Sequence, residues 1–89
     1  REGHDSTIID SRIVIRKALE KKATGVILVH NHPSGVPTPS AEDIRQTQAL
    51  TKALRTCDLH LLDHVVIGDN AYYSFADEEM VDFSKSVLK

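Results

Sequence analysis

The sequence lacks the features of several protein classes. Its 89 residues contain no tryptophan and a single cysteine, Cys57, and aromatic residues make up 4% of the chain. One cysteine excludes an internal disulfide and is compatible with a reducing compartment, so we expect a cytoplasmic protein. No apolar run approaches the length of a transmembrane helix, and the first residues show no signal-peptide pattern. Aliphatic residues must therefore build one small core.

The charge balance does not indicate a nucleic-acid-binding surface. The formal net charge is −2, from 11 Lys and Arg against 13 Asp and Glu, whereas phosphates call for clustered positive charge. A weak basic cluster is found at Arg16, Lys17, Lys21 and Lys22, and it is typical of the solvated face of a helix. Direct nucleic-acid binding by this chain is therefore not expected.

We expect one domain over residues 1–89, and the start at Arg1 without a methionine suggests a piece of a longer protein. After a loop and a short extended piece over residues 1–9, Asp10 or Ser11 can cap a helix over residues 11–22. The spacing predicts an inner stripe of four residues on this helix: Val14, Ile15, Ala18 and Leu19.

An apolar, β-branched run, GVILVH at residues 25–30, follows this helix. The lack of alternation predicts a strand covered on both faces, as in a sheet layered with helices. Side chains alternate along a strand, so His30 and His32 share a face if the extended geometry continues. Both imidazoles would then project from the carboxyl end of the strand, where open α/β sheets place their sites.

A stiff loop connects these histidines to the next helix. It contains all three prolines, Pro33, Pro37 and Pro39, which restrict φ and keep the preceding residues out of the helical region. Ser40 then begins a helix over residues 40–56, and Asp43 completes a pattern that resembles a capping box.

Helical geometry also points Asp43 toward the core. At roughly 100° per residue, a stripe of four residues lies within about 40° of its direction: Thr47, Leu50, Leu54 and Cys57. A buried carboxylate needs a strong partner, and a cation held by two histidines would supply one. Capping and metal binding are therefore both open as roles for Asp43. The same stripe predicts a buried thiol at Cys57.

The segment DLHLLDHVVI at residues 58–67 predicts another strand. His60 and His64 share a parity with Leu62 and Val66, so we expect one face that mixes histidines with aliphatic residues. We assign His60 no role, and a hydrogen-bonded pair of Asp63 and His64 is left open.

The remaining residues predict a hairpin and a helical end. A turn signal at residues 68–70 and YYSF at residues 72–75 predict its second strand. Residues 76–80 are acidic and expected to be helical. The tail to Lys89 is expected to form a further helical turn, with Val81, Phe83 and Val87, or to fray.

Two histidines and one carboxylate suit Zn²⁺ and leave a fourth position for water. Structural zinc sites usually close that position with cysteine, and Cys57 lies about four helical turns from Asp43. An open site lowers the pKa of bound water and polarises a carbonyl, as metal-assisted hydrolysis requires. His-x-His alone is a weak signal, because two unrelated histidines are the commoner explanation.

The full spacing is more specific. His30-x-His32 is followed after seven residues by Ser40 and after two more by Asp43, and this pattern resembles the JAMM (MPN+) metalloprotease motif. HNHPSG at residues 30–35 is similar to the RadC branch, long labelled DNA-repair proteins. LLDH at residues 61–64 and YYSFADE at residues 72–78 extend the resemblance over most of the chain.

This resemblance implies that His30, His32 and Asp43 bind zinc and that Ser40 is catalytic, hydrogen-bonding near the metal water or the developing oxyanion. It implies an α/β fold: a three-layer α/β/α sandwich with a mixed sheet and a cytidine-deaminase-like (JAMM/MPN) core. It also implies a general-base glutamate on a strand upstream of the His-x-His segment. We expect the sequence to begin after that residue, and Glu2 is not expected to occupy its position.

Three functional hypotheses follow. The first is the zinc-dependent hydrolase domain of a RadC-like protein, acting on peptide or isopeptide bonds. Without the glutamate this piece should be nearly inactive, because general acid/base catalysis contributes about 10²–10⁴-fold. The second is a catalytically silent metal-binding module that makes protein contacts in DNA repair or replication. The third, a nucleic-acid binder, follows from the family label and is opposed by the charge balance. The sequence does not specify the substrate, the native partner or the oligomeric state.

Overall fold

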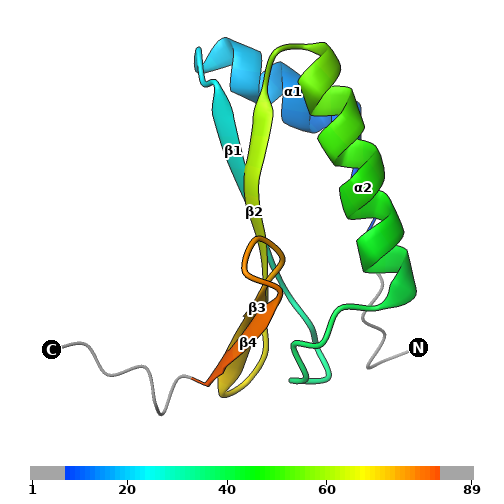
Figure 1. Ribbon diagram of the computed structural model, residues 1–89, viewed down its shortest axis with the longest axis vertical. Coiled ribbons are helices and arrows are strands. Elements are labelled where there is room, and N and C mark those ends of the chain that lie inside the picture. The colour runs from blue at the N-terminus through cyan, green and yellow to red at the C-terminus, as the bar shows by residue number, and fades with distance from the viewer. Residues whose placement is uncertain (1–7, 83–89) are drawn as a thin grey trace, which may run out of the picture.

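The computed structural model describes residues 8–82, which form two helices and four strands (Figure 1). In chain order these are α1 (Ser11–Glu20), β1 (Gly25–Asn31), α2 (Ala41–Thr56), β2 (His60–Ile67), β3 (Ala71–Ser74) and β4 (Glu79–Asp82). The first extended residues through Thr7 and the tail with Phe83 and Val87 lie outside the described residues, so the expectations for them are not tested.

The strands form one mixed sheet in the order β1-β2-β3-β4. β1 and β2 are parallel, with α2 as the connection between them, and the two following pairs are antiparallel. Parallel neighbours need a long crossover, which α2 supplies, and tight hairpins suffice for the others. This confirms the predicted α/β class with a mixed sheet.

The acidic segment after β3 is not helical, and that prediction is wrong. The chain turns after Ser74 and returns as β4, in which Met80 lies opposite Tyr73. Glu78 occupies a positive-φ conformation (53°) in this turn. Pairing with β3 gives Glu79–Asp82 sheet hydrogen bonds along one edge, and these override the local helical preference.

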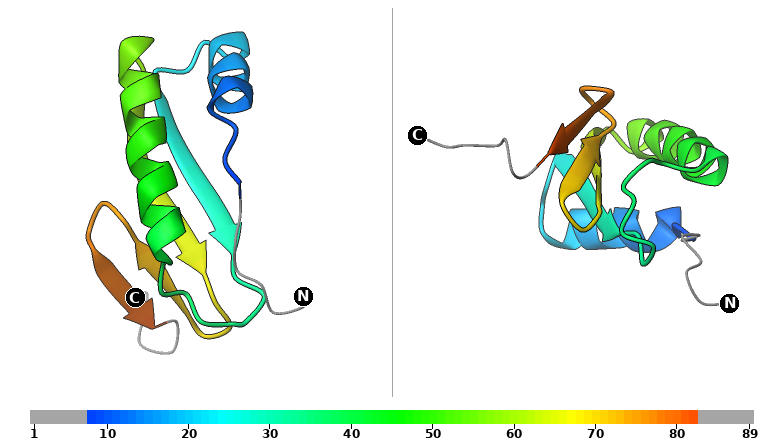
Figure 2. Two further views of the ribbon diagram at one scale, coloured as in Figure 1. Left: turned by 90° about the vertical axis from the view of Figure 1, so that its right-hand side faces the viewer. Right: turned by 90° about the horizontal axis from the view of Figure 1, so that it is seen from below.

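Both helices pack on one face of the β1–β2 pair. A single cluster joins Ala18 of α1 to Leu50 and Leu54 of α2, and Val26 and Leu28 of β1 pack against it. Figure 2 shows α1 and α2 on the same side of the two long strands. The apolar core therefore lies between this helical layer and the sheet.

The opposite face of the same strands is open among the described residues. Ile27, Val29 and Leu62 are each 58% exposed, so the prediction that this strand is covered on both faces does not hold for residues 8–82. Gly25 and Ile27 alternate with core-facing neighbours in the ordinary way of a strand. The described residues thus supply the sheet and one helical layer of the expected sandwich.

The helix predictions hold with local corrections. Asp10 caps α1 by accepting a hydrogen bond from Arg12 N–H, and the helix ends at Glu20, two residues earlier than predicted. Leu19, assigned to the inner stripe, is 56% exposed. In α2 the buried residues include Asp43, Thr47, Leu50 and Leu54 as predicted. Cys57 is exposed rather than buried, because it is the C-cap, where the chain leaves the helix.

An irregularity in the pairing of β1 with β2 changes the faces of β2. Val26 pairs with Leu61, but the next residue, Ile27, pairs with Asp63, so Leu62 is an extra residue in β2. Such a bulge reverses the alternation of side chains beyond it. The predicted shared face is therefore wrong: His60 and Leu62 are exposed, whereas His64 and Val66 are buried.

The surface agrees with the charge analysis. Arg16, Lys17, Lys21 and Lys22 are all exposed at α1 and just after it, as expected for a solvated helix face. Within residues 8–82, neither helix has the length and apolar character that crossing a membrane requires.

Replacing a buried leucine and an exposed leucine by alanine tests the assignment of the core. Leu54→Ala should lower the free energy of unfolding by about 2–5 kcal/mol, because it leaves a cavity at a position with no exposed surface. Leu19→Ala is the matched control on α1, and its effect should be within about 0.5 kcal/mol. Urea unfolding followed by circular dichroism measures both. Equal losses in the two variants would contradict the assignment of the core.

Candidate metal centre

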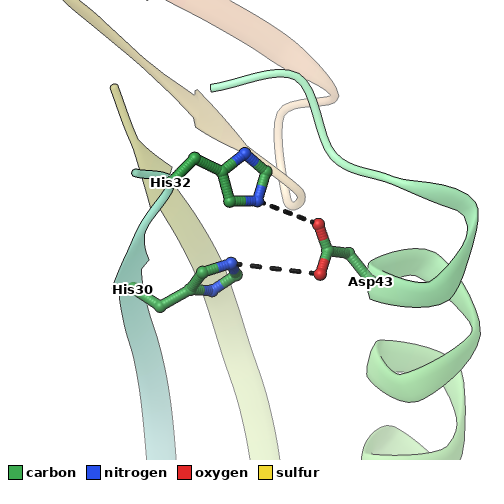
Figure 3. Close-up of side chains that lie close together, drawn as sticks. All are labelled: His30, His32 and Asp43. Atoms are coloured by element: carbon green, nitrogen blue, oxygen red, sulfur yellow. Dashed lines mark hydrogen bonds and ion pairs between the residues drawn. The ribbon is translucent and has the colours of Figure 1, made fainter. Parts of the chain in front are cut away.

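The site lies where β1 ends and α2 begins (Figure 3). His30 is near the carboxyl end of β1, and His32 follows the strand, with its backbone N–H donating to Ile67 O of β2 at 3.0 Å. This hydrogen bond continues the extended geometry past Asn31, so the two imidazoles reach the same side. Asp43 comes from the first turn of α2 and points back at both rings.

The loop between His32 and α2 is tied to the turn after β2. Gly35 N–H donates to His32 O at 2.9 Å, and Asp69 N–H donates to Gly35 O at 2.9 Å. Gly35 has φ +87°, and a Cβ there would clash with the carboxylate of Asp69. A glycine is therefore required at this position. The same loop brings Val36 O within 2.8 Å of His32 Nδ1.

Three potential ligand atoms converge. His32 Nε2 lies 3.1 Å from Asp43 Oδ2, and His30 Nε2 lies 3.9 Å from Asp43 Oδ1. One nitrogen from each ring and one carboxylate oxygen all lie within 4.8 Å of one another. The structure therefore brings together the three residues that the sequence selected as ligands.

Asp43 also caps α2, so the capping role left open for it is present, and the same side chain belongs to the group that could hold a metal ion. Ser40 Oγ accepts from Asp43 N–H at 3.0 Å, and Asp43 Oδ2 accepts from Ser40 N–H at 2.9 Å, which completes a capping box. The Asp43 side chain is 2% exposed. A carboxylate buried to this extent needs more than one partner, and it receives them from the helix start and the imidazoles.

The hydrogen bonds of His32 show that a cation fits here. Val36 O can only accept, so Nδ1 of His32 carries the proton. In the neutral ring Nε2 then holds a lone pair, and that lone pair faces Asp43 Oδ2 at 3.1 Å. Two acceptors at this distance repel each other unless a positive charge, either a metal ion or a proton on Nε2, lies between them.

The spacing matches the demands of zinc. Ligand bonds of about 2.0–2.1 Å in a tetrahedral arrangement place neighbouring donor atoms about 3.3 Å apart. The separations of 3.1 Å from His32 Nε2 to Asp43 Oδ2 and 3.9 Å from His30 Nε2 to Asp43 Oδ1 are close to this value, and they involve the two different carboxylate oxygens. Imidazole nitrogen and carboxylate oxygen are also donors that zinc accepts. The three residues are therefore able to hold a metal ion.

Comparison with known proteins agrees with the motif. The model of the RadC-like JAB domain matches residues 1–80. The chain belongs to this family. Within the RadC-like JAB domain, residues 30–43 carry the three residues that could hold a metal ion: His30, His32 and Asp43.

Curated relatives of this JAB domain are named UPF0758 proteins. The chain is 44% identical over 77 residues to one from Alkaliphilus metalliredigens, covering 86% of the chain and 33% of the relative. It is 47% identical over 78 residues to one from Shewanella pealeana, covering 88% and 35%. A Porphyromonas gingivalis relative is 45% identical over 82 residues, covering 91% and 36%. The chain therefore spans about a third of the length of the relatives it matches.

His64 of the JAB domain, on β2, also belongs to this site, and sequence reasoning missed it. Its side chain is buried, with Nε2 2.8 Å from His30 Nδ1 and Nδ1 2.7 Å from Thr47 Oγ1. The ring of Phe75 stacks on it at a centroid distance of 4.6 Å. Burial, followed by the nearby His30, lowers the pKa of His64 to about 4. The imidazole is therefore neutral at physiological pH.

The signal that could have found His64 is the parallel pairing of the two long strands. In parallel neighbours, side chains at paired positions share a face, and His64 pairs with Leu28, two residues before His30. The bulge at Leu62 concealed this relation, since simple alternation grouped His64 with exposed His60. Thr47 was correctly placed on the inner stripe of α2 without a role.

Asp63 of the JAB domain binds two backbone N–H groups and one hydroxyl, and it is not a hydrogen-bond partner of the His64 ring. It accepts from His64 N–H at 2.7 Å, Ala76 N–H at 2.9 Å and Ser74 Oγ at 2.7 Å. Partial burial acts to raise the pKa of Asp63, but these hydrogen bonds outweigh it and lower that pKa below 3.8. The carboxylate thereby ties β2 to the turn after β3, which carries Phe75.

The lowered pKa of Asp63 in the folded state makes the free energy of unfolding depend on pH. Asp63 stabilises the fold above its unfolded pKa, and this contribution disappears as the pH falls through the lower folded value. Asp63→Asn should therefore reduce the free energy of unfolding at pH 7, and the difference from the wild type should shrink below pH 3.8. Urea unfolding across this pH range measures it, and a difference that does not change with pH would contradict the role of the charge.

Proposed function

We propose that this chain is the metal-binding part of a JAB-type zinc hydrolase, and that the protein cleaves peptide or isopeptide bonds with water. The observation that carries the proposal is the convergence of His30, His32 and Asp43, with the lone pair of His32 Nε2 directed at a buried carboxylate. Two imidazole nitrogens directed at one buried carboxylate are the arrangement that a bound metal ion would require.

The donor set supports an open site. Among residues 8–82 the potential metal-ligating cluster contains two histidines and one aspartate, and Cys57 is exposed at the other end of α2. Cys57 therefore cannot supply the fourth metal ligand, whereas structural zinc sites usually complete their coordination with cysteine. When bound, a zinc ion with three protein ligands lowers the pKa of water toward neutrality and polarises a carbonyl group.

Each residue at this centre has a separate role in the proposed reaction. His30 and His32 donate Nε2 lone pairs, and Asp43 supplies negative charge while holding the helix start. The hydroxyl of Ser40 accepts from Asp43 N–H through a lone pair, so its own proton remains available for a substrate oxygen. Ser40 can thus cap α2 and hydrogen-bond the developing oxyanion.

The general base must be another residue. Asp43 Oδ2 is engaged by Ser40 N–H and His32, and Oδ1 faces His30, so this carboxylate is committed to the metal centre. The resemblance to JAMM enzymes implies a glutamate from a strand upstream of His30. Such a base contributes about 10²–10⁴-fold to the rate.

A cavity beside the centre supports a peptide substrate. It is open to solvent and has a volume of about 280 Å³, and its lining includes His30, His64, Leu28, Ile13 and Val14. Apolar walls next to a metal ligand can hold an aliphatic side chain close to a scissile bond. We therefore expect the bound group to be peptide-like, and a cytoplasmic location agrees with the free thiol of Cys57.

A second candidate is a catalytically silent metal-binding module that makes protein contacts in DNA repair or replication. The observation that favours it is the exposed apolar face formed by Ile27, Val29 and Leu62, because such surfaces commonly contact other protein segments. In this case zinc would stabilise the fold without supporting hydrolysis.

Metal content tests the ligand assignment. The purified protein should contain close to one equivalent of zinc, and His32→Ala should lose most of it, because the ring supplies a ligand and a hydrogen bond to the loop. His60→Ala removes an exposed histidine from β2 and should retain the metal. Elemental analysis measures the stoichiometry. Full zinc content in His32→Ala would rule out the assignment.

Asp43→Asn separates metal binding from capping. The amide oxygen can still accept from Ser40 N–H, so helix α2 should persist, whereas loss of the negative charge should weaken zinc binding. A competition titration against a chromophoric chelator measures the affinity, and circular dichroism measures the helix. An affinity equal to that of the wild type would show that Asp43 is only a cap.

Hydrolysis by the full-length protein decides between the two functions. We expect zinc-dependent cleavage of peptides or isopeptide-linked proteins, lost on chelation and in His32→Ala, and retained in His60→Ala. A full-length protein that holds stoichiometric zinc and cleaves neither substrate class would support the silent module. Nucleic-acid affinity that falls steeply with salt would instead indicate phosphate contacts.

A further inference from the structure

We propose that His64 is a positioning residue that holds His30 in the tautomer needed for metal binding, through a hydrogen-bond chain that starts at the backbone of Asp43. The inference rests on the proposed metal site and identifies how that site is prepared before a metal arrives. Four residues on three elements form the chain: Asp43 and Thr47 of α2, His64 of β2 and His30 of β1.

The direction of the chain is set at Thr47. Its hydroxyl has one hydrogen, and it donates that hydrogen to Asp43 O at 2.6 Å, because a carbonyl oxygen can only accept. Toward His64 Nδ1, 2.7 Å away, the same hydroxyl must therefore accept. It follows that Nδ1 of His64 carries the proton and Nε2 has the lone pair.

The second step passes this constraint to His30. His64 Nε2 is 2.8 Å from His30 Nδ1, and an acceptor on His64 requires a donor on His30. His30 Nδ1 is therefore protonated, and the lone pair of His30 resides on Nε2, the atom 3.9 Å from Asp43 Oδ1. The opposite tautomer would place a proton at the position where the metal has to bind.

The two histidine ligands thus reach the same state by different routes. Val36 O fixes His32 directly, through a carbonyl of the adjoining loop. For His30, the chain returns to the residue from which it started, since Asp43 contributes its carbonyl at one end and its carboxylate at the other. Partners of this kind orient metal-bound imidazoles and raise their basicity.

The ring of His64 is held firmly enough to act in this way. Phe75 stacks on it with an interplanar angle of 6°, and the backbone N–H of Phe75 donates to His64 O at 3.0 Å. Asp63 accepts the backbone N–H of His64 and of Ala76, on either side of this contact. The segments at residues 61–64 and 72–78 therefore hold the ring of His64 in place beside His30.

The tautomer of His30 in the metal-free protein tests the proposal directly. Long-range ¹H–¹⁵N spectra distinguish a protonated Nδ1 from a protonated Nε2, and they require neither metal nor activity. We expect His30 and His64 both to carry the proton on Nδ1. A proton on Nε2 of His30 in the folded wild type would overturn the proposal, even if the protein binds zinc and hydrolyses peptides.

Variants at His64 connect the tautomer to affinity. His64→Phe keeps an aromatic ring against Phe75 and removes the acceptor, so His30 should become free to protonate Nε2, and zinc affinity should fall by about 10–100-fold. His64→Gln can offer an amide oxygen to His30 Nδ1 and should recover part of this loss. His60→Phe is the matched control on the same strand and should bind zinc as the wild type does.

Thr47 provides a milder test that does not depend on the fold tolerating phenylalanine. Thr47→Val preserves shape and removes the hydroxyl, so His64 loses the acceptor that fixes its proton, whereas Thr47→Ser retains it. We expect weaker zinc binding and a mixed His30 tautomer in Thr47→Val, with both properties restored in Thr47→Ser. Wild-type affinity and an unchanged His30 tautomer in Thr47→Val and His64→Phe would overturn the proposal.

These outcomes remain separate from those that test the function. Loss of hydrolysis with the expected tautomers would refute the proposed reaction and leave the hydrogen-bond chain intact. A zinc loss in His64→Phe without any change in the tautomer of His30 would mean that the ring acts only through packing, and this result would also overturn the proposal.

Discussion

A carboxylate buried at the start of a helix is the constraint on which the site depends. Asp43 is 2% exposed, and burial of an ionised group is costly unless strong partners replace water. The protein places those partners on three sides: the N-terminus of α2 through Ser40, His32 after β1, and His30 within β1. The positions of the loop, the strand end and the helix start all follow from this requirement.

The same carboxylate couples stability to function. A capping aspartate needs only the first turn of its helix, but Asp43 lies on the stripe that also carries Thr47, Leu50 and Leu54. Its orientation therefore belongs to core packing as well as to capping. If Asp43 binds a metal as proposed, its side chain loses little conformational entropy on binding, since its rotamer is already determined.

Much of the fold followed from local patterns in the sequence. Ser40 and the stripe from Asp43 to Leu54 predicted the long helix, and the run at residues 25–30 predicted β1, because caps and periodicity are local signals. The hairpin strand at Tyr72 and Tyr73 was confirmed as β3. The strand β4 could not be predicted in this way, since its residues form a strand only by pairing with β3.

The structure brings together the predicted site residues that are close in sequence, and it adds one that is far away. His30, His32 and Asp43 lie within one short segment, so their spacing reveals the cluster. His64 joins them only through the pairing of β1 with β2, which no local pattern encodes. Exposure of Leu19 and Cys57 had the same cause, because their surroundings depend on where each helix ends and what packs beside it.

The bulge in β2 has a consequence for how this segment can change in length. Leu62 has no partner in β1 and is 58% exposed, so the identity of its side chain matters little. Removing Leu62 would join Leu61, which packs on the core, directly to Asp63, which pairs with Ile27. Plain alternation would then return, and His64 would keep its place on the inner face. An insertion between Leu61 and His64 would instead turn His64 toward the solvent unless a second bulge absorbed it. This part of β2 should therefore tolerate the loss of one residue better than the gain of one.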